Sequence, residues 1–321
     1  MKNGIPGPLG LGIFYWGRMV RTAHIAALMV GTLLAVGCGV ERDRVELSAD
    51  SAASPRHIVS LAPSLTETLF ALGLGERVVG VTRYCVYPPE VAELAKVGGH
   101  LDPNFEAIVS LEPDLVVVIP SSSESGKRLE SLGIRVLEVD QHDVQAVLES
   151  VEIVAEACGV PERGANLRAE IDRRLAAIRR VVEHAARPRT VVVVGHQAGD
   201  DAVRSVWAAG SDTFYDGVLR IAGGDNAVTG GLARYPELSR EGLASIDPDV
   251  VVDVIAGLED RNLDPEDVRV GWMRLTELRA VREQRITVLA GDQMVVPGPR
   301  LPEMVEAIAR ALHPDLEWES Q

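Results

Sequence analysis

One stretch of twelve residues occurs twice in this chain and constrains the fold more than any other feature. Residues 106–117 read EAIVSLEPDLVV, and residues 241–252 read EGLASIDPDVVV. Each copy predicts a short helix, a turn at Pro-Asp and an apolar strand buried on both faces. Proline disfavours helical geometry in the residue before it, which fixes the position of the turn. The duplication therefore predicts two similar α/β lobes.

The longest helical pattern lies between the two copies, at residues 161–186. Apolar side chains recur there at helical spacing: Leu167, Ile171, Leu175, Ile178 and Val182. Charged residues between them are typical of a helix with one buried face. We therefore expect an N-terminal α/β lobe at 56–160, one long bridging helix at 161–186 and a C-terminal α/β lobe at 187–321, with central sheets of parallel type. A stiff bridge predicts a limited hinge or twist motion.

The first 37 residues predict an export signal of the lipoprotein type. Arg18 and Arg21 precede an apolar run from Ala23 to Gly37, which is short for a membrane span. The run ends in Ala-Val-Gly-Cys, and small residues followed by Cys38 resemble the lipobox of bacterial lipoproteins. An ordinary cleaved signal and an uncleaved anchor are the alternatives, and Met19 is an alternative start.

Residues 38–55 are charged and then Ser/Ala-rich without periodicity, which predicts a flexible tether. We therefore expect an exported protein in the periplasm or cell envelope, anchored to the membrane by a lipid on Cys38. Cys85 and Cys158 are the other cysteines, and an exported protein could pair them.

Composition excludes several classes of function. The net charge of −15 argues against nucleic-acid binding, which needs a basic footprint. The chain has no GxGxxG or Walker A sequence for a nucleotide, and no Cys/His spacing for structural zinc. We expect no cofactor of its own.

Near the N-terminus, Ser64 and Glu67 have the spacing of a capping box at the start of a helix.

Eight segments in order carry a family resemblance: HIVSLAPSLTETLFALG, GVTRYCVYPPEV, VGGHLDPNFEAIVSLEPDLVV, LESLGIRV, GGDNAV, YPELSREGLASIDPDVVV, VREQRITVL and PGPRLPEMVEAIARALHP. Together they resemble the substrate-binding proteins of bacterial ABC importers for cobalamin and iron–siderophores, over residues 56–314. The resemblance implies two α/β lobes bridged by one long helix, a ligand held between them, small opening motions and a monomer that is not an enzyme.

The resemblance also implies a pair of docking residues. In the cobalamin-binding members, a Glu on each lobe meets Arg residues of the membrane permease, and these match Glu106 and Glu241. Carboxylates on separate lobes can grip a permease dimer through charge-assisted bonds. The alternative is that each Glu only stabilises the first turn of its own helix.

Candidate ligand residues follow from the same match. Tyr84 stands at an aromatic position, and His100 and Tyr235 stand where cobalamin binders place tryptophans; flat aromatic faces suit a macrocycle. Four further candidates lie on loops expected to face the ligand: Ser122, Arg234, His196 and Arg300. His100 could coordinate cobalt or haem iron as a neutral imidazole. The alternative is a loop histidine or one that hydrogen-bonds the ligand.

The leading hypothesis is capture of cobalamin (vitamin B12), a cobalt corrinoid, for delivery to a permease. A ferric siderophore or haem is the second choice. A tetrapyrrole-processing enzyme is a distant alternative, because no residue pair has recognisable catalytic spacing. A sensor that uses the fold without transport is the third class.

Overall fold

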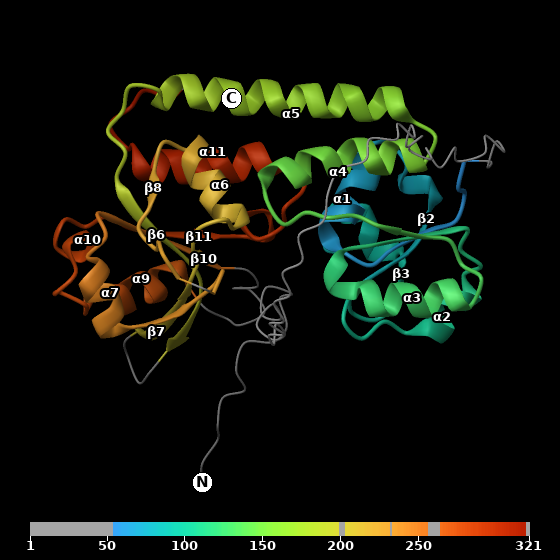
Figure 1. The fold of residues 1–321 in the computed structure, drawn as a ribbon, viewed down its shortest axis with the longest axis horizontal. Coiled ribbons are helices and arrows are strands. Elements are labelled where there is room, and N and C mark those ends of the chain that lie inside the picture. Colours follow the sequence, from blue (N-terminus) through green and yellow to red (C-terminus); the bar gives the residue numbers. More distant parts are fainter. Residues whose placement is uncertain (1–53, 199–202, 232, 256–263, 319–321) are drawn as a thin grey trace, which may run out of the picture.

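The computed structural model describes residues 54–318 apart from 199–202, 232 and 256–263. The predicted signal, Cys38 and nearly all of the expected tether therefore lie outside the described residues. Figure 1 shows two α/β lobes side by side beneath one long helix, α5. The fold class predicted from the duplication, two lobes joined by a bridging helix, is confirmed.

The first lobe is built on a parallel sheet of order β3-β2-β1-β4-β5. Its strands are β1 Ile58–Ser60, β2 Val78–Val81, β3 Ala95–Lys96, β4 Leu115–Val118 and β5 Val136–Glu138; its helices are α1 Pro63–Ala71, α2 Phe105–Ser110, α3 Ser123–Ser131 and α4 Val144–Ala157, with 3-10 turns Gly75–Arg77, Pro89–Glu93 and Pro120–Ser122. Strands β1 and β4 are buried along their whole length, and alternate residues enter two different hydrophobic clusters. This burial on both faces explains the unbroken apolar sequence of β4.

The duplicated stretch folds in the same way in both lobes. In each copy the residue before proline adopts a left-handed conformation that ends the helix, with φ of 47° at Glu112 and 42° at Asp247. The Asp after proline then accepts backbone N–H bonds at the start of the neighbouring strand. Asp114 binds the amide of Arg56 at 2.8 Å, and Asp249 binds that of Arg189 at 2.9 Å. The repeated Pro-Asp thus aligns two adjacent parallel strands.

Helix α5, Pro161–Val182, lies across both lobes and packs against α4 in the first and α11 in the second. The expected stripe is buried at Ile171, Leu175, Ile178 and Val182. The helix ends four residues earlier than the expected 186, because the pattern there continues only as the exposed residues Glu183 and His184.

The second lobe has a mixed sheet of order β11-β10-β6-β7-β9, with β8 beside β6. Its strands are β6 Arg189–Ala198, β7 Val203–Ala208, β8 Asp225–Asn226, β9 Glu237–Ser239, β10 Val250–Ile255 and β11 Ile286–Ala290; its helices are α6 Phe214–Ile221, α7 Arg240–Ile246, α9 Pro265–Met273, α10 Arg279–Arg282 and α11 Leu301–Leu312, with a 3-10 turn Asp292–Met294. Strands β6 and β7 pair antiparallel. His196, expected on a loop, therefore lies within a strand, because Val203, Val206 and Ala208 are buried in β7, which pairs back along β6.

The capping box expected at Ser64 and Glu67 was also wrong. Ala62 caps α1 and Pro63 opens it, because proline at the first turn needs no N–H partner. Ser64 instead donates from Oγ to Gln141, and Glu67 is buried, only 3% exposed. Glu67 lies against Arg300, which belongs to the second lobe.

Arg300, the residue before α11, joins the two lobes. Its Nε donates to Glu67 at 2.9 Å, its Nη2 donates to the other Glu67 oxygen and to Asp292, and its guanidinium lies 4.0 Å from the ring centroid of Tyr87. Burial raises the pKa of Glu67, while Arg300 opposes that shift. We call the four residues Glu67, Tyr87, Asp292 and Arg300 the inter-lobe clamp.

Candidate ligand-binding site

Three predicted site residues follow strands of the first, parallel sheet. Tyr84 comes after β2, His100 after β3 and Ser122 after β4. Because β1 to β5 are parallel, the loops after these strands leave the sheet at one edge, where open α/β sheets bind ligands. The fold therefore explains why residues far apart in sequence meet.

The structure brings Tyr84, His100 and Ser122 together. The rings of Tyr84 and His100 meet edge to face, with centroids 6.1 Å apart and an interplanar angle of 66°. Ser122 donates from Oγ to the backbone carbonyl of His100 at 2.7 Å. Ser122 thus acts on the loop that carries His100, and its own hydroxyl is already engaged.

His100 carries an unusual polar atom. The residue is 6% exposed, and its Nε2 is buried without a hydrogen-bond partner. Burial lowers the pKa of the imidazole, with a smaller opposing effect from Asp102. A neutral imidazole with an unsatisfied nitrogen can coordinate a metal or bond a ligand. Within the described part of the chain, no group of three or more His, Cys, Asp or Glu side chains could hold a metal by itself.

An ion pair that sequence reasoning missed flanks this site. Arg83 donates from Nη2 to both oxygens of Asp102, at 3.0 and 2.9 Å, and to the Tyr84 hydroxyl at 3.2 Å. Its guanidinium also lies 4.9 Å from the Tyr84 ring centroid. The sequence did contain a signal for this pair, because Arg83 is adjacent to Tyr84 and Asp102 stands two residues after His100.

Gly99 makes the close approach of these groups possible. A Cβ at this position would lie 2.3 Å from Asp102 Oδ1, 3.0 Å from Arg83 Nη2 and 3.1 Å from the Tyr84 ring. The loop is closed by a bridge between Gly98, at φ +91°, and Pro103. Gly98 therefore allows the loop to turn, and Gly99 leaves room for the ion pair beside it.

Exposed apolar side chains gather on the same two loops. Val86 is 62% exposed, Tyr87 42% and Leu101 48%. They stand within three residues of Tyr84 or His100 along the chain. Exposed apolar surface grouped near a few polar atoms is typical of a binding site for a largely apolar ligand.

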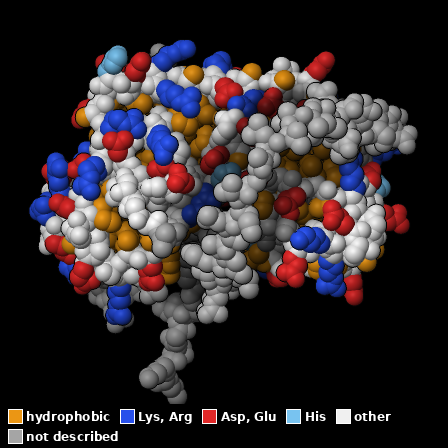
Figure 2. All heavy atoms as spheres, in the orientation of Figure 1, with side chains coloured by type: hydrophobic (Ala, Val, Ile, Leu, Met, Phe, Trp, Pro, Cys, Tyr) orange, Lys and Arg blue, Asp and Glu red, His pale blue; other side chains and the backbone are white. Residues whose placement is uncertain are grey.

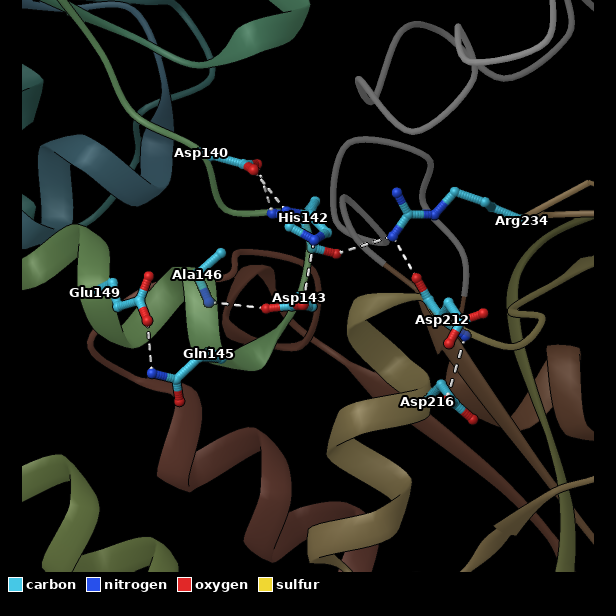
Figure 3. Close-up of polar contacts among 9 residues, drawn as sticks. All are labelled: Asp140, His142, Asp143, Gln145, Ala146, Glu149, Asp212, Asp216 and Arg234. Carbon is cyan, nitrogen blue, oxygen red and sulfur yellow. Dashed lines mark hydrogen bonds and ion pairs between the residues drawn. The ribbon is translucent and has the colours of Figure 1, made fainter. Parts of the chain in front are cut away.

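Arg234 and Tyr235 lie where the second lobe meets the first. Figure 3 shows the Arg234 side chain directed at the carbonyl groups of His142, in the first lobe, and Asp212, in the second. Its Nε is buried without a partner. Tyr235 is half-buried against the main hydrophobic cluster, and burial raises the pKa of its hydroxyl. Asp143 beside His142 caps α4 through the amide of Ala146.

The two remaining candidates have partners within the protein. Arg300 is held in the inter-lobe clamp and is 13% exposed at its side chain. His196 lies in strand β6 rather than in a loop, and its Nε2 is 3.5 Å from the fully buried carboxylate of Asp253. Trp272 donates to the same carboxylate at 2.7 Å. His196 thus belongs to a buried polar group of the second lobe, separate from the contacts around Tyr84.

Cys85 and Cys158 are both free and buried. Cys85 contacts the hydroxyl oxygens of Thr66 and Thr82 at 3.2 Å each, and burial raises the pKa of its thiol. A protonated, packed thiol is a poor nucleophile and a poor metal ligand. Neither the possible disulfide nor a reactive thiol is seen.

Glu106 and Glu241 occupy equivalent places in the two lobes. Each is exposed in the first turn of its helix, which Asn104 caps in α2 and Ser239 caps in α7. Figure 1 shows α2 and α7 on the side of the molecule away from α5. The Ser239 hydroxyl lowers the pKa of Glu241, which keeps that carboxylate ionised.

On the face in view, basic side chains are interspersed with acidic ones, so that face offers no continuous basic footprint (Figure 2). None of the helices in the described part of the chain has the length and hydrophobicity of a transmembrane segment.

Comparison with known proteins gives one consistent family. The periplasmic binding protein family matches residues 58–292. The chain is 30% identical over 319 residues to an uncharacterized ABC transporter substrate-binding lipoprotein of Bacillus subtilis, YvrC, covering 92% of this chain and 98% of that one. It is 30% identical over 276 residues to a cobalamin-binding protein of Halobacterium salinarum, covering 81% and 70%.

A solved structure agrees with these sequence relatives. The periplasmic heme-binding protein BhuT, in complex with two hemes, has a TM-score of 0.69 to this chain at 30% identity, covering 80% of this chain and 98% of that one. The family match, the relatives and the two-lobe fold thus point the same way. The chain belongs to the periplasmic binding protein family and is a substrate-binding protein of the ABC importer type.

Proposed function

We propose that the chain captures a metal-centred tetrapyrrole between its lobes and delivers it unchanged to a permease. The carrying observation is the pair Tyr84–His100, an aromatic ring against a neutral imidazole whose Nε2 is buried without a partner. Because buried polar atoms are normally paired, such an atom at the sheet edge is a place for a ligand contact. The exposed side chains of Val86, Tyr87 and Leu101 supply apolar surface for a macrocycle.

Cobalamin is the first candidate ligand. A relative at 30% identity is a cobalamin-binding protein, and the chain covers 70% of its length. Ferric haem is the second candidate, supported by the His100 nitrogen, since an imidazole is a strong axial ligand for haem iron. The heme-binding relative of known structure adds to that case. We give anionic ferric siderophores lower weight, because Arg83 and Arg300 are already paired with carboxylates.

We also propose a location and a partner. The predicted signal and Cys38 would place the protein outside the cytoplasm on a lipid anchor, as a monomer. Glu106 and Glu241 would then meet Arg residues on the two halves of a permease. Their equivalent positions on the two lobes support this, because a two-fold partner needs one similar group from each lobe.

The first test is a titration of the purified chain with cyanocobalamin, aquocobalamin and ferric haem. We expect saturable binding of at least one tetrapyrrole, with the visible band of the metal changing where His100 coordinates. Substitution His100→Ala should weaken that binding roughly tenfold, about 1.4 kcal/mol. The control is His184→Ala, which removes an exposed histidine after α5. Absence of saturable binding by every tetrapyrrole would contradict the proposal.

The second test uses pH. Coordination needs the neutral imidazole, and burial lowers the pKa of His100 below its ordinary value of 6.5. Affinity for the coordinated ligand should therefore stay constant from pH 8 down to about 6.5 and decrease only below that, as His100 gains a proton. The variant His100→Asn should bind more weakly and lose this decrease. A midpoint above 6.5 would show that His100 is not the group involved.

The third test concerns docking. The double variant Glu106→Ala/Glu241→Ala should keep its ligand affinity and lose retention by the cognate permease in detergent, because both charge-assisted contacts are removed. The matched control is Glu124→Ala/Glu266→Ala, which removes one exposed first-turn Glu from each lobe. If both double variants lost permease retention equally, the loss would come from helix stability and not from docking. If cells with the Glu106→Ala/Glu241→Ala variant took up the ligand as well as cells with the wild type, a sensor would be favoured over a transport protein.

A further inference from the structure

The arginines near the candidate site are already engaged by the protein itself. Arg83 is paired with Asp102, and Arg300 with Glu67 and Asp292. Arg234 donates to the backbone carbonyls of His142 and Asp212. A guanidinium that holds a carboxylate in this way presents little net charge to a third group. Arg83 and Arg300 therefore attract an anionic ligand less strongly than their formal charges suggest.

Of the carboxylates that pair with Arg83 and Arg300, Asp102 is the one on the loop that carries His100. Its side chain is 65% exposed, whereas Glu67 is buried in the inter-lobe clamp. Asp102 follows His100 by two residues, and its partner Arg83 precedes Tyr84. Gly99 leaves room for the pair against the loop, since a Cβ there would lie 2.3 Å from Asp102 Oδ1 and 3.0 Å from Arg83 Nη2. The pair therefore lies directly beside Tyr84 in the candidate site.

From this arrangement we infer that Asp102 is a specificity-determining residue, which masks Arg83 and so favours tetrapyrroles edged with neutral amides over those edged with carboxylates. The inference rests on the proposed function and deepens it. The corrin of cobalamin carries amide side chains, and their N–H groups can donate to the free lone pairs of the Asp102 carboxylate. Haem carries two propionates, which Arg83 cannot bind while it is paired with Asp102.

Hydrogen bonding to Arg83 lowers the pKa of Asp102, so the carboxylate that pairs with Arg83 stays ionised through the neutral range. An exposed pair can nevertheless be removed without unfolding the chain, because exposed ion pairs add little to stability. Asp102→Asn therefore isolates charge from shape: the amide keeps the size of the side chain and one acceptor oxygen, and it releases the guanidinium of Arg83.

The experiment measures dissociation constants of the full chain for ferric haem and for cyanocobalamin. Asp102→Asn should raise the ratio of haem affinity to cyanocobalamin affinity about fivefold. Adding Arg83→Gln to that variant should return the ratio to the wild-type value, because the released charge is then gone. Glu266→Gln, which breaks the equally exposed pair with Arg269 on α9, should leave the ratio unchanged.

Three results would overturn the inference. They are an unchanged ratio in Asp102→Asn, an equal increase in Glu266→Gln, or an increase that persists after Arg83→Gln. These differ from failure of the proposed function: if neither probe saturates the wild-type protein, the tetrapyrrole assignment falls and the masking role falls with it. Thermal unfolding of each variant, expected to match the wild type, confirms that the comparison is between folded proteins.

Discussion

The relative position of the two lobes depends on the ion pair between Glu67 and Arg300. Helix α5 connects the lobes along one side, but a single helix fixes the distance between them better than their relative rotation. Arg300 adds a second connection by holding a buried carboxylate of the first lobe while it contacts Asp292 of its own lobe and the ring of Tyr87. Breaking such a pair leaves a desolvated charge, at a cost of about 3–5 kcal/mol. The clamp therefore opposes wide opening.

The polar groups around the site fall into two sets, those with partners in the described part of the protein and those without. Arg300 contacts Glu67, Asp292 and Tyr87, and the Ser122 hydroxyl donates to the backbone carbonyl of His100. His100 Nε2 and Arg234 Nε remain buried without partners among the described residues. A rigid frame with a few open polar atoms is preorganised, so binding costs little ordering of side chains.

Much of this architecture could be predicted from the sequence, because it depends on local rules. The Pro-Asp turns and the buried stripe of α5 were both expected, and each depends on residues that lie close together in the sequence. The loops bearing Tyr84, His100 and Ser122 could be assigned to one edge because parallel strands end together.

What sequence could not give were contacts across long separations. Glu67 matched a capping box, yet its partner is 233 residues away. Strand β7 begins at Val203, and its antiparallel pairing with β6 makes the sheet mixed. His196 was expected on a loop, but it lies in β6 and takes part in this pairing. The masking of Arg83 by Asp102 depends on how two loops fold over Gly99. Such tertiary choices follow from packing, which a one-dimensional pattern does not encode.

The most direct test of the account is a measurement of the distance between the lobes in solution. Spin labels on Ser131→Cys and Asp267→Cys, both exposed sites on opposite lobes, in a Cys38→Ser background, report that distance by double electron–electron resonance. The account predicts one narrow distribution for the wild type and a broad one once Glu67→Ala removes the clamp. A wild-type distribution already as broad as that of the Glu67→Ala variant would contradict it.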